Sequence, residues 1–391
     1  MSLKIAVLKE TAKFEKRVAA SPDTVKKYIG MGFTVSVEKG AGLGSSFTDA
    51  AYKEAGASIA ASTASAVKDA DIILCVQSPD AETLSATKKD AVLIGSLNPY
   101  GNKDDFKGYN AAKVTAITTE FVPRITRAQN MDVLSSQANL AGYRAVIDAA
   151  GEYGAAFPMM MTAAGTVPPT KVFVMGAGVA GLQAIATAKR LGAVVSATDV
   201  RPAAKEQVQS LGGTFVMVED EETAAAETSG GYAKEMSDEY KKKQAALIAE
   251  TIKKQDVVIC TALIPGRPAP VLVSEDMVKT MKPGSIIIDL AAAQGGNCPL
   301  SEPDKVVEKH GVKIVGYTNM ASRVAGNASA LYAKNLLNLV THLFDSEAKA
   351  LNIDLEDEIT GAIVLTEKGK TVHSNFTKET KKKTDKKEEA A

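Results

Sequence analysis

The chain has 391 residues, long enough for two or three domains with sizeable cores. Lysine plus arginine (46) equals aspartate plus glutamate (46), so no net field attracts nucleic acid or an anionic membrane, and neither is an expected partner. No apolar run approaches the roughly 18 to 20 residues that span a bilayer. The N-terminus enters a strand-like run directly and carries Glu10, unlike a signal peptide. We therefore expect a soluble cytoplasmic protein.

Strand and helix patterns alternate over the first third of the chain. A strand-like run at residues 4–10 is followed by a helical pattern at 21–32 and a second strand-like run at 33–40. Three more strand-like runs follow, at residues 71–77, 91–97 and 113–120. This βαβ rhythm predicts a parallel, doubly wound sheet.

Two helical segments lead into and out of a second region of the same kind. Residues 129–157 and 329–344 carry apolar side chains at spacings of three and four, as helices do. Between them the strand-like runs resume, at residues 171–175, 193–199, 214–218, 256–263, 285–291 and 313–319. The predicted fold class is α/β, with two Rossmann-like, doubly wound parallel-sheet domains joined by long helices.

These patterns predict one domain inserted in the other. Residues 1–128 and 322–370 form the expected N-terminal domain, and residues 129–321 form the expected inserted domain. Small-molecule sites occur preferentially at domain interfaces, so the ligand is expected in a cleft between the two.

Two segments interrupt the alternation. Residues 219–244 are highly charged and contain Gly231 and Tyr232. A long insertion of this kind is either a mobile lid or a solvated helical hairpin, and both can hold if only its tip moves. Residues 371–391 end in mixed charges without apolar spacing and are expected to be a disordered tail.

The segment from residue 171 to 201 predicts a dinucleotide site, because a strand, a glycine turn, a helix and a strand ending in an acid follow in order. Gly176 permits the tight turn, Gly178 lets a pyrophosphate approach the backbone, and Gly181 lets the helix pack closely on the strand. Gly192 lies where the helix should end. The alternative, a glycine turn without a ligand, leaves the following acid unexplained.

Asp199 lies about 20 residues beyond the glycines, where a carboxylate accepts hydrogen bonds from the adenosine ribose. A carboxylate there repels a 2′-phosphate, so NAD(H) is favoured over NADP(H). Arg201 weakens this preference, because an arginine in the same loop can also serve a 2′-phosphate.

Cysteine and histidine give no sign of a metal. Cys75, Cys260 and Cys298 are far apart in sequence and are expected to be reduced thiols, two of them in buried strands. The three histidines, His310, His342 and His373, show no ligand spacing, and we expect no metal site.

Three stretches resemble one family closely. They are PRITRAQNMDVLSSQANLAGYRAVIDAA from Pro123, the glycine segment with its preceding FPMMMTAAGTVPPT, and the loop GGYAKEM. Together they resemble the NAD(H)-binding component, domain I, of the proton-translocating nicotinamide nucleotide transhydrogenases, which use the Si-Re-specific transfer. More distantly, Arg17 with Val18, Pro22 and the run VEKGAG resemble alanine dehydrogenases of the same two-domain architecture.

One departure separates the chain from the dehydrogenases. That family handles protons and the substrate carboxylate with a lysine and a histidine, whereas this chain has Gln77 at the lysine's place and no histidine in the run IGSLNPYG. Neither replacement acts as an acid or base near pH 7. Hydride passage between two nicotinamides moves no proton to a side chain and needs chiefly positioning, with reacting carbons about 3 to 3.5 Å apart.

The resemblance implies a set of site residues. Arg124, Asp132 and Ser135 surround the nicotinamide, Gln129 lies nearer the second nucleotide, and Tyr232 closes over the site; these five are the implied catalytic residues. Asp132 and Ser135, three apart, are expected on one helix face. A structural ion pair of Arg124 with Asp132 is the alternative. The other implied cofactor contacts are Ile125, Thr126, Arg127, Gly176, Ala177, Gly178, Val179, Ala180, Gly181, Asp199, Val200, Arg201, Gly231, Gln244 and Leu263.

The resemblance also implies partners. NADP(H) is bound by a separate beta subunit, a membrane-spanning component carries protons, and this component forms a homodimer peripheral to the inner face of the membrane. The leading hypothesis is thus a subunit that binds NADH and passes hydride to NADP⁺ on its partner. A self-sufficient dehydrogenase of the alanine or saccharopine type and a non-catalytic NAD-sensing module are the alternatives.

Overall fold

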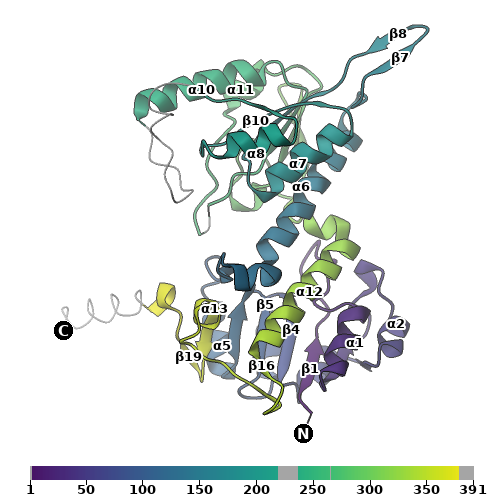
Figure 1. The fold of residues 1–391 in the computed structure, drawn as a ribbon, viewed down its shortest axis with the longest axis vertical. Coiled ribbons are helices and arrows are strands. Elements are labelled where there is room, and N and C mark those ends of the chain that lie inside the picture. Colours follow the sequence, from purple (N-terminus) through teal and green to yellow (C-terminus); the bar gives the residue numbers. More distant parts are fainter. Residues whose placement is uncertain (1, 219–236, 265, 378–391) are drawn as a thin grey trace, which may run out of the picture. The chain divides into compact units, whose positions relative to one another are not determined.

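A computed structural model describes residues 2–218, 237–264 and 266–377, and it divides into two compact units (Figure 1). The first unit comprises Met1–Gln137 and Ser322–Ala391, and the second comprises Ala138–Ala321. The division falls inside a helix, α6 (Val133–Glu152), whereas the sequence pattern placed the domain boundary just before it. Both units are α/β with mainly parallel sheets, as predicted.

The first unit is built on an eight-stranded sheet of order β19-β18-β6-β5-β4-β1-β2-β3. Its parallel strands are β1 (Lys4–Val7), β2 (Thr34–Glu38), β3 (Ser58–Ala60), β4 (Ile72–Gln77), β5 (Val92–Ser96) and β6 (Thr115–Thr118). Two antiparallel strands, β18 (Val364–Glu367) and β19 (Lys370–Thr371), complete one edge. The helices are α1 (Pro22–Gly30), α2 (Asp49–Glu54), α3 (Thr63–Val67), α4 (Ala81–Ser85), α5 (Asp105–Ala112), α12 (Ala325–Leu343) and α13 (Glu358–Ile363).

Alternation along the strands divides the core of this unit into two layers. In β4, Ile72 and Leu74 face a layer that includes residues of α1, α12 and α13, whereas Ile73 and Cys75 face a layer with α3, α4 and α5. Successive strand side chains point to opposite faces, so a sheet covered by helices on both faces needs apolar residues at every position. This explains the unbroken run IILCV in β4.

The second unit carries a seven-stranded sheet of order β11-β10-β9-β12-β13-β15-β14. Its strands are β9 (Lys171–Met175), β10 (Val194–Thr198), β11 (Thr214–Phe215), β12 (Val257–Cys260), β13 (Ile286–Asp289), β14 (Val306–Lys309) and β15 (Val312–Val315), of which β14 is antiparallel. Its helices are α7 (Val179–Arg190), α8 (Ala204–Ser210), α10 (Asp238–Ile252) and α11 (Glu275–Thr280).

Small side chains bring α6 close to α7 in this unit. Ala145 and Ala149 of α6 share a buried cluster with Ala184 and Ala188 of α7. The contact is closest at Gly142, where an added Cβ would lie only 2.0 Å from the Ala180 carbonyl oxygen. The α7 helix therefore begins against α6.

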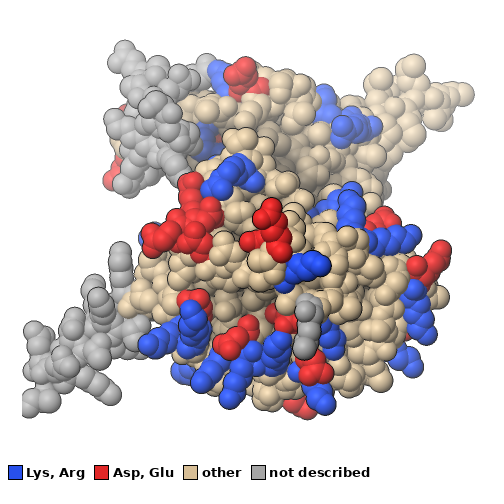
Figure 2. All heavy atoms as spheres, turned by 60° about the horizontal axis from the view of Figure 1, so that its bottom comes forward, with Lys and Arg blue, Asp and Glu red and all other residues tan. Residues whose placement is uncertain are grey.

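Short hairpins complete both units: β7 (Met160–Thr162) with β8 (Gly165–Val167) in the second, and β16 (Phe344–Asp345) with β17 (Ala350–Leu351) in the first. In the described part of the chain, every helix is too short or too polar to cross a bilayer. Figure 2 shows lysine and arginine side chains interspersed with aspartate and glutamate on the face that it presents.

The structure bears on two of the predicted segments. The predicted disordered tail starts too early, because Thr371 pairs with Thr366 in the sheet and the Phe376 ring lies 4.8 Å from that of Phe106. Phe376, just before the charged run, is an apolar side chain that packs in the core of the first unit. Residues 238–244, the end of the segment expected to be a lid or a helical hairpin, belong to α10, whose N-cap Ser237 accepts a hydrogen bond from the Tyr240 amide. Residues 219–236 lie outside the described part.

Candidate functional site

The turn between β9 and α7 contains three glycines with different surroundings. Gly176 has a φ of +106°, in the region that favours glycine, and an added Cβ would lie 2.5 Å from the Thr261 hydroxyl. At Gly181 an added Cβ would lie 1.8 Å from the Gly176 carbonyl oxygen, so α7 packs directly on the turn. The space around Gly178 is open. Two glycines are thus required by packing, while the third leaves room for a ligand.

The helix start beside this turn can bind an anion. Gly178 is the N-cap of α7 and supplies no side-chain oxygen to its first amides. Amides of a first helical turn have no intrahelical acceptors, and the helix dipole adds partial positive charge there. Val179, the first residue of α7, is 40% exposed, whereas Ala177 is buried. A pyrophosphate fits this place.

Asp199 is fixed directly after β10 by four hydrogen bonds. Its carboxylate accepts from the Ala177 amide (2.7 Å), the Arg201 amide (2.8 Å), and the Arg201 guanidinium (2.9 and 3.0 Å). Burial opposes ionisation, but the Arg201 hydrogen bonds and the Ala177 amide outweigh it and lower the pKa of Asp199. The acid is therefore ionised and joined to the glycine turn. Arg201 thus occupies three acceptor positions of the Asp199 carboxylate.

Asp132 and Ser135 meet at the start of α6. The Asp132 carboxylate accepts from the Ser135 amide (2.9 Å) and from its hydroxyl (2.5 Å). Asp132 is therefore the residue that caps α6, and the two side chains meet through this cap rather than as neighbours on a helix face. A short 3₁₀ helix, Thr126–Met131, precedes the cap.

The other predicted residues of this segment lie around that 3₁₀ helix. Arg124, Thr126 and Gln129 are exposed, and Ile125 packs partly against the core of the first unit. Arg127 pairs with Asp357 at 3.0 Å. Within the described part of the chain, Arg124 and Asp132 form no ion pair, because Asp132 binds Ser135 instead.

Three further predicted residues, Gln244, Val200 and Leu263, lie at the carboxyl edge of the second sheet. Gln244 of α10 donates to the Thr198 hydroxyl (3.1 Å) and accepts from the Val218 amide (2.8 Å). Leu263, after β12, and Val200, after β10, are exposed. Gly231 and Tyr232 lie outside the described residues.

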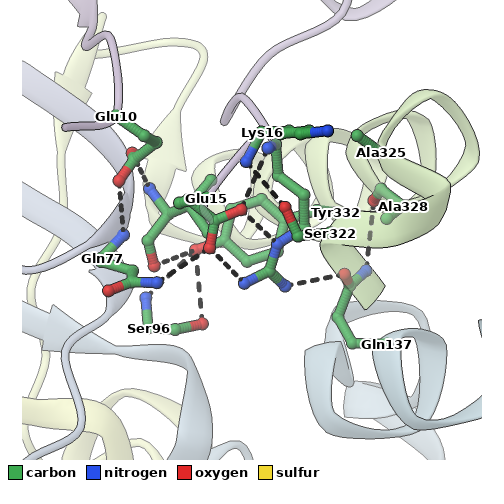
Figure 3. A network of polar contacts seen from close by, with 12 residues as sticks. Glu10, Glu15, Lys16, Gln77, Ser96, Gln137, Ser322, Ala325, Ala328 and Tyr332 are labelled. Atoms are coloured by element: carbon green, nitrogen blue, oxygen red, sulfur yellow. Dashed lines mark hydrogen bonds and ion pairs between the residues drawn. The ribbon is translucent and has the colours of Figure 1, made fainter. Parts of the chain in front are cut away.

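A buried polar network at the first sheet escaped the sequence analysis (Figure 3). The Arg17 guanidinium binds Glu15 through two nitrogens (2.8 and 2.7 Å) and donates to the Gln137 side chain of α6 (2.9 Å). Gln77, at the end of β4, donates to Glu15 (2.8 Å). These contacts fix Gln137 two residues beyond Ser135. Glu15 and Gln137 gave no sequence signal, since their burial depends on segments about 120 residues apart.

Glu10 lies beside this network. Its carboxylate accepts from the Val76 amide (2.6 Å) and the Gln77 amide (3.2 Å). Burial raises the pKa of Glu10 to about 7, against the lowering effect of these amide bonds. Both oxygens are thus engaged in holding the end of β4.

Comparison with known proteins identifies the family. The family profile described as "Alanine dehydrogenase/PNT, N-terminal domain" matches residues 6–141, and "Alanine dehydrogenase/PNT, C-terminal domain" matches residues 145–374. The chain belongs to the alanine dehydrogenase/PNT family. The predicted resemblance is confirmed.

Within this alanine dehydrogenase/PNT family the chain resembles transhydrogenase subunits more closely than alanine dehydrogenases. It is 57% identical over 380 residues to the first portion of NAD(P) transhydrogenase subunit alpha from Rhodospirillum rubrum, covering 96% of this chain and 99% of that protein. A crystal structure of transhydrogenase from Sinorhizobium meliloti matches with a TM-score of 0.87 and 54% identity, covering 94% of this chain and all of that one. Alanine dehydrogenase 1 of Staphylococcus aureus is 29% identical over 91% of this chain and 92% of that protein.

Proposed function

We propose that the chain is the NAD(H)-binding subunit of a Si-Re-specific, proton-translocating NAD(P) transhydrogenase. It binds NADH and supports hydride transfer to NADP⁺ held by a beta subunit. The coupling to proton movement takes place in a membrane-spanning partner, which keeps this subunit at the inner face of the membrane. The family membership and the transhydrogenase relatives support this function over other Rossmann activities.

The residues fit NAD(H). The open space at Gly178 and the first-turn amides of α7 suit the pyrophosphate, and the ionised Asp199 suits an unphosphorylated adenosine ribose. Bound NADH supplies the hydride. Asp132 and Ser135, held in one geometry by their own hydrogen bonds, orient the nicotinamide amide, and Arg124 offers it a charged donor. The proposed contacts of the remaining predicted residues, Gly231 and Tyr232 among them, follow from the same resemblance.

One observation favours transhydrogenation over amino-acid oxidation. Gln77 stands at the end of β4 with its side-chain amide bound to Glu15 at 2.8 Å, and a carboxamide does not act as an acid or base near pH 7. Glu10, whose pKa burial raises to about 7, lies beside Gln77, but both of its oxygens accept hydrogen bonds from backbone amides. Hydride transfer between nicotinamides requires neither group to titrate.

A homodimer is part of the proposal. The β7–β8 hairpin exposes Met160 (44%) and Met161 (80%), and all residues of β7 are exposed. Exposed apolar side chains on a hairpin commonly mark a protein contact. Sedimentation equilibrium should give twice the chain mass of 40.9 kDa, and Met161→Asp should shift it toward the monomer.

The test is oxidation of NADH by an NADP⁺ analogue. The protein is assayed alone and then with a purified transhydrogenase NADP(H)-binding domain, and turnover is expected only in the mixture. Arg124→Ala and Asp132→Ala should each abolish most of this turnover. Arg190→Ala is the matched control, since Arg190 is the last residue of α7, at the opposite end from the glycine turn, and should leave the rate unchanged.

A second assay, NAD⁺ reduction by alanine, separates the alternatives. NAD⁺ reduction by alanine with the protein alone would establish a self-sufficient dehydrogenase. Tight NADH binding without turnover in either assay would indicate a sensing module.

A further inference from the structure

The sheet order of the second unit locates the ligand edge without reference to side chains. From β9 the chain builds outward through β10 and β11, and then returns to β12 on the other side of β9. Ligands of doubly wound sheets bind at the carboxyl ends of the strands that flank such a switch point. The residues after β12 therefore border the dinucleotide, on the side of β9 opposite to Asp199.

Those residues present an apolar surface. Leu263 is 48% exposed and Ile264 is 43% exposed, directly beyond Thr261 and Ala262. Thr261 is joined to the glycine turn through its hydroxyl, which donates to the Gly176 carbonyl at 3.0 Å. Exposed leucine and isoleucine remain in place only if the backbone beneath them is held.

A buried asparagine holds that backbone. Asn297 is 0% exposed, and its side-chain amide pairs with both polar groups of Ala262, accepting from the amide (3.1 Å) and donating to the carbonyl (2.9 Å). It also donates to the Pro270 carbonyl at 2.8 Å. Asn297 thus connects residues 262 and 270 through hydrogen bonds to the backbone of both.

The segment carrying Asn297 is itself fixed. The buried Asp289 carboxylate accepts from the Cys298 amide (3.0 Å) and the Ser301 hydroxyl (2.6 Å). Gly296, with a φ of +81°, lies so close that an added Cβ would be 2.8 Å from Asp289. Asn297 therefore reaches Ala262 from a rigid turn at the end of β13.

We propose that Asn297 is a positioning residue for the cofactor: it holds Leu263 and Ile264 as the wall against the nicotinamide half of NAD(H). The proposal rests on the proposed NAD(H)-binding function. The sheet topology assigns the nicotinamide half of NAD(H) to Leu263. Asp199 follows β10 and takes the adenosine half, whereas Leu263 follows β12 on the other side of β9. Loss of Asn297 leaves three backbone groups of the half-buried Ala262 and Pro270 without this partner.

The experiment compares a whole dinucleotide with its adenosine half. Dissociation constants for NADH and for AMP are measured on the full-length wild type, Asn297→Ala, Asn297→Asp and Leu263→Ala, with thermal unfolding alongside. For Asn297→Ala we expect the NADH constant to rise about tenfold while the AMP constant changes less than about twofold. Asn297→Asp should change the two constants as Asn297→Ala does, because it loses both hydrogen bonds that the Asn297 side chain donates. Because Leu263 is exposed, Leu263→Ala should still fold. It should also raise the NADH dissociation constant while changing the AMP constant little. Combining it with Asn297→Ala should raise the NADH constant little further.

Gln255→Ala is the matched control. Gln255 is a buried amide side chain of the same unit that donates to a backbone carbonyl at 3.1 Å, but it precedes β12 at the opposite edge of the sheet. It should lower the unfolding temperature without changing either constant. Equal weakening of NADH and AMP by Asn297→Ala, or unchanged NADH binding in Leu263→Ala, would overturn the proposal. Failure of wild-type transhydrogenation with the partner would refute the proposed function alone, because NADH binding is measured separately.

Discussion

The contact of α6 with the start of α7 offers a sharp test of how the nucleotide turn is supported. In Gly142→Ala the new Cβ would lie 2.0 Å from the Ala180 carbonyl oxygen and 2.8 Å from its carbonyl carbon. Ordinary contact begins near 3.4 Å, so the two helix surfaces must separate by roughly 1.4 Å. Both obstructing atoms are backbone, so no side-chain rotation relieves the clash.

Two opposing effects set the size of the change. Alanine favours a helix over glycine by about 1 kcal/mol, whereas overpacking of this kind costs about 1 to 3 kcal/mol. We therefore expect Gly142→Ala to lose about 1 kcal/mol in the free energy of unfolding. Because the displaced residue, Ala180, belongs to the first turn of α7, the NADH dissociation constant should also rise about tenfold.

Gly151→Ala is the matched control in the same helix, because an added Cβ there meets nothing within 4 Å. Gly151→Ala should raise the free energy of unfolding by up to about 1 kcal/mol and leave the NADH dissociation constant unchanged. Urea unfolding and NADH fluorescence titration measure both quantities. Gly142→Ala with wild-type stability and wild-type affinity would refute the reasoning, since the close approach would then have no energetic consequence.

Three further predictions concern carboxylates. Asp199→Asn should raise the NADH dissociation constant about tenfold and narrow the preference for NADH over NADPH, because it removes the negative charge and releases Arg201. An unchanged ratio of the NADPH and NADH dissociation constants, measured in parallel titrations, would contradict this role. The pKa of Glu10, raised by burial to about 7, favours the neutral form in the folded state, so wild-type stability should fall as pH rises from about 4.5 to about 7. Urea unfolding of Glu10→Gln should lack that fall, and an identical slope would remove Glu10 as its source. Asp132→Ala should lower the free energy of unfolding by about 1 kcal/mol, because it removes a helix cap, and should abolish most hydride transfer. Ser274→Ala, which removes the cap of α11, should lower the free energy of unfolding equally and leave hydride transfer intact. Equal loss of hydride transfer in both variants would reduce Asp132 to a structural residue.

The layout of strands and helices and the dinucleotide turn were readable from the order of the residues alone. These features are local: side-chain periodicity follows from the geometry of a single helix or strand, and the requirement for glycine at Gly176 follows from the local turn. The strand runs beginning at residues 4, 71 and 171 are examples. The prediction of the tail at residue 371 was wrong because Phe376 packs on residues more than 250 positions earlier, which periodicity does not reveal.

The polar residues that support the site, in contrast, are selected by the packing of distant segments. Asn297 reaches Ala262, and Arg17 reaches Gln137, across chain separations that no local pattern encodes. A buried amide or ion pair depends on the low exposure and fixed geometry created when such segments pack together. The residues proposed to touch the nucleotide left a motif in the sequence, whereas the residues that hold them in place became visible only through the fold.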